Sequence, residues 1–155
     1  MAPGRRAVAT VALEAAPASI LAFEDFVDGL GFLTGPERDR LMLAGGEILD
    51  NIVKHAPPAG RGRIRARVSR GGGAAAPTVL LGFFFRAPGF AAFASDESLG
   101  AAPEPLFDPA HRRWRGIGLV MCRNLARRVR FRPGELMDRI FLEFDAGPRD
   151  GGVQE

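Results

Sequence analysis

Hydrophobic residues recur along this chain with two different periods, and the order of these periods limits the fold. Ala7 to Leu13 and Thr78 to Phe85 are short, strand-like hydrophobic runs. Arg61 to Ser69 alternates arginine with hydrophobic residues, which is typical of a half-buried strand. Two segments at helical spacing stand before it, from Ala16-Pro17 to Leu30 and from Pro36 to about His55. The first half of the chain therefore predicts strand, helix, helix, strand, strand.

The second half begins with a different composition. The segment from Arg86 to Trp114 is rich in alanine, proline and glycine, and we expect a long binding loop or lid there. A helix is predicted from Leu119 to about Arg128, followed by strands over Val129 to Arg132 and Arg139 to Asp145. Short connections between consecutive strands favour antiparallel pairing. The expected fold is an α/β (α+β) two-layer sandwich, with a mixed, mostly antiparallel sheet and helices on one face.

A length of 155 residues suits one domain with a real hydrophobic core. We expect an N-terminal arm over 1–6, a single domain over 7–146 and a flexible tail over 147–155. The single cysteine, Cys122, excludes a disulfide scaffold. The longest apolar run, Val79 to Phe85, is too short to span a bilayer. These features predict a cytoplasmic protein.

The basic residues are almost all arginine, and the pI is 10.3. However, 21 basic against 18 acidic residues leave a net charge of only +3. One group of arginines alternates along a predicted strand: Arg61, Arg63, Arg65 and Arg67. A second group lies in and after the third predicted helix: Arg123, Arg127, Arg128, Arg130 and Arg132. No aromatic residue interleaves with the first group, as single-strand binding would require. We expect solvated faces, or contacts with an acidic protein, and no direct contact with nucleic acid.

Three polar residues on the second predicted helix share one line. Glu47, Asn51 and His55 are four residues apart, so they lie beside the hydrophobic stripe of that helix. An asparagine oxygen suits Mg²⁺, which it usually shares with substrate phosphates. A glutamate one turn away can deprotonate a nucleophile. The alternative is a solvated helix flank that ends in a histidine favourable to the helix dipole.

A glycine pair opens the third predicted helix. Gly116 and Gly118 lie between a loop and the helix, where backbone N–H groups can approach an anion. Arg112, Arg113 and Arg115 stand just upstream and can contact phosphate oxygens. The alternative is an ordinary glycine-rich entry to a helix.

Together these parts resemble the Bergerat-fold ATPases, the GHKL or histidine kinase-like group, and most closely the anti-sigma-factor serine/threonine kinases. The segment Leu41 to Ala56 (LMLAGGEILDNIVKHA) resembles the N-box, and Ala87 to Phe90 (APGF) resembles the tail of the G1 box. The segment Arg115 to Phe131 resembles the G2 box with its helix, and Ile140 to Phe144 resembles the closing strand. The similarity covers roughly Val8 to Phe144, and the N-box is its most specific part.

This resemblance implies a role for each matching residue. Glu47 would be the catalytic carboxylate, and Asn51 would be the Mg²⁺ ligand that bridges to ATP. The remaining nucleotide-binding positions would be His55, Pro88, Gly89, Arg115, Gly116, Gly118 and Leu119. The resemblance also implies a sigma factor as binding partner, and an antagonist protein as the substrate that is phosphorylated.

One departure from the family's pattern leaves two functions open. Phe85 stands where the G1 box has the aspartate that accepts a hydrogen bond from adenine, and Ala87 replaces its first glycine. An unpaired buried donor costs about 1–3 kcal/mol. The chain is therefore either an ATP- and Mg²⁺-dependent serine/threonine kinase of the anti-sigma type, or a non-catalytic, protein-binding member of the same fold. The oligomeric state stays open, with a homodimer as one alternative.

Overall fold

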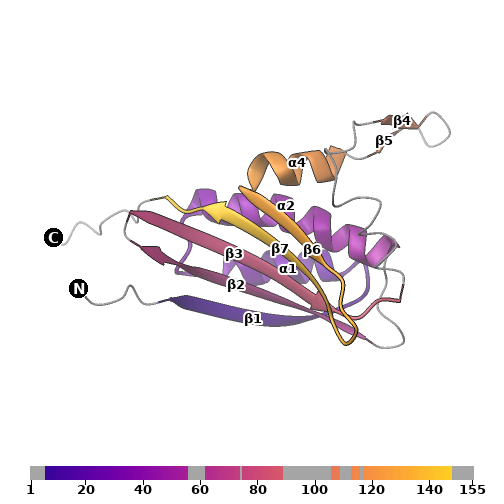
Figure 1. Cartoon of the computed structure of the whole chain (residues 1–155), viewed down its shortest axis with the longest axis horizontal. Helices are drawn as coiled ribbons and strands as arrows, with labels where there is room; N and C mark the ends of the chain where they lie inside the picture. The colour runs from indigo at the N-terminus through magenta and orange to yellow at the C-terminus, as the bar shows by residue number, and fades with distance from the viewer. Residues whose placement is uncertain are drawn as a thin grey trace.

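The protein is an α+β fold in which helices and an antiparallel sheet form two layers (Figure 1). The computed structural model describes residues 6–55, 62–73, 75–88, 106–108, 113–115 and 117–147, with the backbone alone for 106–108, 113–115, His55, Ile117 and Leu119. The elements are β1 (Ala7–Glu14), α1 (Ser19–Asp28), α2 (Gly35–His55), β2 (Arg63–Gly73), β3 (Ala76–Phe85), β4 (Leu106–Asp108), β5 (Arg113–Arg115), α4 (Ile117–Leu125), β6 (Arg128–Arg132) and β7 (Asp138–Asp145).

The main sheet has the strand order β1-β2-β3-β7-β6, and each neighbouring pair is antiparallel. The expected two-layer α+β arrangement is confirmed, but the described sheet is wholly antiparallel rather than mixed. The reason is that β2–β3 and β6–β7 are adjacent hairpins, and β7 then returns alongside β3 in the opposite direction. In Figure 1 helices α1 and α2 lie behind this sheet, on one of its faces, and α4 lies next to α2 near the β6 edge.

The hydrophobic core fills the space between the helices and the sheet. Side chains alternate along each strand, so every second one faces the helices. On the helix side, α2 contributes the stripe that the sequence predicts, and α1 contributes Phe23, whose ring lies 5.6 Å from that of Phe83 on β3. The largest fully buried side chains are Phe23, Phe83, Phe144, Leu41, Ile48, Leu49, Ile52, Ile64, Leu81, Ile140 and Leu142.

Helix α2 begins with a capping box that also fastens the helix to the sheet. The Glu37 backbone N–H donates to Thr34 Oγ1 (3.4 Å), and Glu37 Oε2 accepts from the Thr34 backbone N–H (2.9 Å). The buried Glu37 carboxylate also pairs with Arg70 on β2 and accepts from the Gly147 N–H after β7. Burial opposes ionisation of Glu37, but the hydrogen bonds from Thr34, Arg70 and Gly147 and the charge of Arg70 outweigh it, so its pKa is lowered.

The glycine pair inside α2 has one member that is needed for close packing. A Cβ at Gly45 would stand 2.6 Å from the Phe23 ring and 2.8 Å from a Leu81 methyl group. Gly46 has nothing within 4 Å of that position. Gly45 is therefore the position where side chains of α1 and β3 approach α2 closely.

Two segments contain more regular structure than the sequence predicts. The segment that begins at Arg86 includes the short hairpin of β4 and β5, which ends at Arg115. The sequence does not predict this hairpin, because three-residue strands are too short to show an alternation. Strand β2 continues through Gly73, beyond the predicted end at Ser69, and β3 begins at Ala76, before the predicted start at Thr78. Gly72 adopts a φ of +96°, which favours glycine. Among the described residues, no helix is long and apolar enough to cross a membrane.

Candidate functional site

The candidate site lies on the flank of α2 that faces α4. Glu47 and Asn51 are half-buried, one turn apart, beside the buried Ile48 and Ile52. The hydrophobic residues hold this face of α2 against the sheet, and the two polar side chains are thereby fixed at the edge of the core. Among the described residues, neither polar side chain has a hydrogen-bond partner. Their carboxylate and amide groups are of the kinds that can bind a cation or a polar ligand.

The first turn of α4 approaches Glu47 closely at Gly118. A Cβ built on Gly118 would overlap the Glu47 carboxylate, with Glu47 Cδ only 2.9 Å away. Any side chain at this position would have to displace the carboxylate. The structure thus brings together the predicted catalytic residue and one of the predicted phosphate-binding glycines, although they are far apart in the sequence.

Cys122, one turn further along α4, fixes the two helices against each other. Its Sγ donates a hydrogen bond to the Ala44 carbonyl on α2 (3.3 Å), and the side chain is fully buried. Burial and the nearby negative charge of Glu47 raise the pKa of the thiol to about 12. Cys122 is therefore a neutral packing residue and not a nucleophile.

We expect Cys122 to be unreactive in the folded protein. Thiolate is the reactive form, and with a pKa of about 12 almost none is present at pH 8. Titration with a chromogenic disulfide reagent should release no thiolate from the native protein. It should release one equivalent after unfolding in urea, since the chain has one cysteine. Rapid stoichiometric reaction of the native protein would show that the α2–α4 contact opens readily.

The donors at the site suit a hard cation only when a ligand completes its coordination. Glu47 and Asn51 offer carboxylate and amide oxygens, which are the ligand types that Mg²⁺ takes. Within the described ranges, no group of three or more histidine, cysteine or acidic side chains is arranged to hold a metal ion. An asparagine oxygen such as that of Asn51 can share a cation with oxygens of a bound phosphate, as is usual for Mg²⁺.

A second feature lies at the end of β3, where the sequence departs from the family pattern. Phe85 and Ala87 are buried, with 3% and 5% of their surface exposed. Directly opposite Phe85 on β7 is Asp138, which is 5% exposed. Its Oδ2 accepts the Ala87 backbone N–H (2.9 Å) and its Oδ1 accepts the Gly134 N–H (3.2 Å). Asp138 therefore holds the chain in place just after β3.

Asp138 is not among the site residues predicted from the sequence, although the alternation along β7 indicates that this residue faces inward. Ile140, Leu142 and Phe144 alternate along β7 and face the core, and Asp138 occupies the next position of the same alternation. An acidic residue at an inward position requires hydrogen-bond partners. The sequence pattern could thus have marked it as a buried carboxylate.

The other predicted site residues are placed less completely. His55 is the last residue of α2, Arg115 ends β5 and Leu119 lies in α4, each described by its backbone alone. Pro88 is exposed just after β3. Gly89 and Gly116 lie outside the described residues. The structure therefore brings Glu47, Asn51 and Gly118 to one place, and leaves the rest of the predicted set as a prediction.

Comparison with known proteins adds no identification to this geometry. An antiparallel sheet with helices on one face is shared by many unrelated functions, so the fold alone names none of them. The function must be argued from the site residues themselves. Set against models of known protein families and against curated proteins, the chain matches none of them.

Proposed function

We propose that this chain is a histidine kinase-like (GHKL) regulatory protein of the anti-sigma type, which binds ATP and Mg²⁺ in the cytoplasm and phosphorylates a protein antagonist. The observation that carries the proposal is the contact between Glu47 and Gly118. A half-buried carboxylate against a glycine at the start of a helix is an arrangement suited to phosphoryl transfer. The glycine leaves room for the Glu47 carboxylate beside the start of α4, where backbone N–H groups can hold a phosphate.

In this proposal each residue has a limited task. Bound ATP supplies the phosphoryl group. Asn51 holds the cation through its amide oxygen, and backbone N–H groups at the start of α4 hold phosphate oxygens. Glu47 takes the proton of a serine or threonine hydroxyl as the new O–P bond forms and the bond to the ADP oxygen breaks. Positioning and charge neutralisation provide most of the catalysis.

The adenine contact requires a different residue from the one in the family pattern. Phe85 offers no acceptor, but its cross-strand partner Asp138 is a carboxylate on the same inward face. An ionised carboxylate has about four acceptor sites, and backbone N–H groups occupy two of those on Asp138. We propose that Asp138 accepts the adenine amino group in place of the missing aspartate.

Calorimetry with Mg-ATP tests this function. We expect the wild-type protein to bind, and Asn51→Ala to lose most of the affinity that depends on Mg²⁺, because it removes the amide oxygen. Phe85→Asp serves as the matched comparison for the adenine contact. Tighter binding in Phe85→Asp would show that the wild type lacks a full adenine acceptor. Absence of binding by the wild type at millimolar Mg-ATP would overturn the proposed function.

The second candidate is a non-catalytic regulatory module with the same partners. It is favoured by Phe85 and Ala87, two buried residues that stand where the family pattern has the adenine-binding aspartate and the first glycine. This module would bind a sigma factor or its antagonist without phosphorylating either. Phosphorylation of the antagonist by the purified protein, and its loss in Glu47→Ala, would exclude this second candidate.

A further inference from the structure

The face of the sheet that the helices leave uncovered is rich in arginine. Side chains on this open face are those at alternate positions facing away from α1, α2 and α4. The arginines among them are Arg63, Arg65, Arg67, Arg128, Arg130, Arg132 and Arg139, and all are exposed. The acidic residues are Glu14, Glu143 and Asp145. In Figure 1 the open face is the one toward the viewer.

Strand pairing places phenylalanines between these arginines. Across the sheet, one row runs Ala12, Arg65, Phe84, Arg139, Arg132, and the next runs Thr10, Arg67, Gly82, Phe141, Arg130. The sequence does not show this interleaving, because the aromatic residues come from β3 and β7 and the arginines mostly from β2 and β6. The absence of aromatic residues within the stripe on β2 therefore no longer argues against nucleic-acid binding.

Gly82 allows the two phenylalanines to form one continuous strip. A Cβ at Gly82 would stand 2.9 Å from the Phe84 ring and 3.2 Å from the Phe141 ring, so both rings lie close over this glycine. The rings meet edge to face, with centroids 5.7 Å apart. Covering the glycine accounts for the position of the rings, but it does not account for the arginines on both sides.

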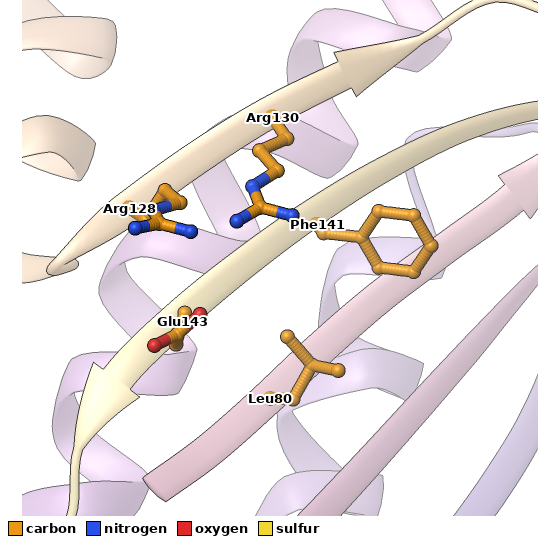
Figure 2. A pocket seen from close by; sticks show the side chains of 5 residues that line it. All are labelled: Leu80, Arg128, Arg130, Phe141 and Glu143. Atoms are coloured by element: carbon orange, nitrogen blue, oxygen red, sulfur yellow. The ribbon is translucent and has the colours of Figure 1, made fainter.

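A shallow hollow lies on each side of the aromatic strip. One, of about 240 Å³, is lined by Leu80, Arg128, Arg130, Phe141 and Glu143. Figure 2 shows its two arginines on β6 reaching over β7 on the side of the sheet away from the helices. The other, of about 230 Å³, is lined by Thr10, Arg65, Arg67 and Phe84. Each hollow thus combines two guanidinium groups with one aromatic ring.

The charge is concentrated in the same two rows. Three arginines in the first row and two in the second give +5 with no acidic residue, against a formal +3 for the whole chain. None of the ion pairs between described residues involves these five arginines. The positive charge is therefore a local footprint rather than a scattered surplus.

We propose that the open face of the sheet binds single-stranded nucleic acid, with phosphates on the arginine rows and bases against Phe84 and Phe141. A polyanion with exposed aromatic bases matches both components of the surface. A second copy of the chain would bring arginine rows against each other, and an acidic peptide would make no use of the aromatic strip. This surface lies on the opposite side of the sheet from Glu47, so it does not depend on the proposed nucleotide site.

Fluorescence anisotropy with a labelled oligothymidylate of about 15 nucleotides tests this proposal. We expect binding at about 50 mM salt that weakens steeply as salt is added. Arg67→Gln/Arg130→Gln should reduce affinity and make the salt slope shallower by about 1.4, since each lost phosphate contact on a single strand contributes about 0.7. The matched control is Arg40→Gln/Lys54→Gln, which removes the same charge from α2 and should leave the slope unchanged.

The aromatic contribution is tested with Phe84→Leu. Leucine still covers Gly82, so the fold is retained, and thermal unfolding checks this. Loss of base stacking should reduce affinity roughly tenfold. The proposal is overturned if wild-type protein does not bind the strand at low salt, or if both double variants bind alike. It is also overturned if poly-L-glutamate of equal charge competes as strongly as the strand, because the surface would then fit an acidic protein.

Discussion

Arg70→Met is expected to lower the free energy of unfolding by about 3–5 kcal/mol, because it leaves the Glu37 carboxylate buried without its counter-charge. Glu37 is fully buried, and Arg70 contacts both of its oxygens at 3.3–3.4 Å. Arg70 also donates to the Gly147 carbonyl (2.7 Å), so the variant releases the chain after β7 as well. Urea unfolding followed by circular dichroism measures the loss.

The control for this prediction is the double variant Glu37→Gln/Arg70→Met. Glutamine keeps the oxygen that caps α2 but carries no charge, so much of the lost stability should return. If Arg70→Met changed the free energy of unfolding by less than about 1 kcal/mol, the Glu37–Arg70 pair would contribute no more than an exposed salt bridge does. That result would also contradict the inference that Glu37 and Arg70 hold α2, β2 and the chain after β7 together.

The same carboxylate gives the stability a defined pH dependence. The pKa of Glu37 is lower in the folded protein than its ordinary value of 4.5. The unfolded chain therefore binds the proton more readily than the folded one. The stabilisation is fully present above about pH 4.5 and is lost as the pH falls through the lower, folded pKa. In Glu37→Gln this part of the acid sensitivity should disappear from urea unfolding measured at a series of pH values.

Gly118→Ala is expected to reduce phosphoryl transfer by about 100-fold, because a methyl group takes the place of the Glu47 carboxylate. The overlap is with the end of a flexible side chain, so the carboxylate can turn aside and the fold can survive. Alanine also favours helix over glycine by up to about 1 kcal/mol, which protects the stability of α4. The measurement is the rate of antagonist phosphorylation beside the free energy of unfolding.

Gly46→Ala is the matched control for this variant. Its Cβ would meet nothing within 4 Å, so it makes the same chemical change in a helix without touching Glu47. We expect normal turnover and a small gain in stability. If Gly118→Ala retained wild-type turnover, the proximity of Glu47 to the start of α4 would have no catalytic meaning. The proposed role of Glu47 would then fail.

Much of the fold was predictable from hydrophobic periodicity. The stripe of α2 and the alternation on β2 are strong signals because each spans several turns or residue pairs. The hairpin of β4 and β5 was not predictable, since three-residue strands carry no alternation to detect. The wholly antiparallel sheet was not predictable either. The pairing of β3 with β7 is made between segments that are distant in the sequence.

The candidate site was predictable in part for the same physical reason. Glu47 and Asn51 lie on one helix, so their spacing alone places them together. Their meeting with Gly118 depends on the packing of α4 against α2, which no local pattern reports. The position of Asp138 opposite Phe85 depends on strand register. Register also decides that Phe84 and Phe141 stand among the arginines.

The order of strands in the sheet has a consequence for how the protein folds. Two hairpins, β2–β3 and β6–β7, connect neighbouring segments and can form early. The contact that unites them pairs Thr78 with Asp145 and Phe85 with Asp138, so it must close a large loop that contains α4. Such non-local pairing slows folding. During synthesis, β3 therefore remains an unpaired edge on one side until β7 leaves the ribosome, and the sheet is completed only then.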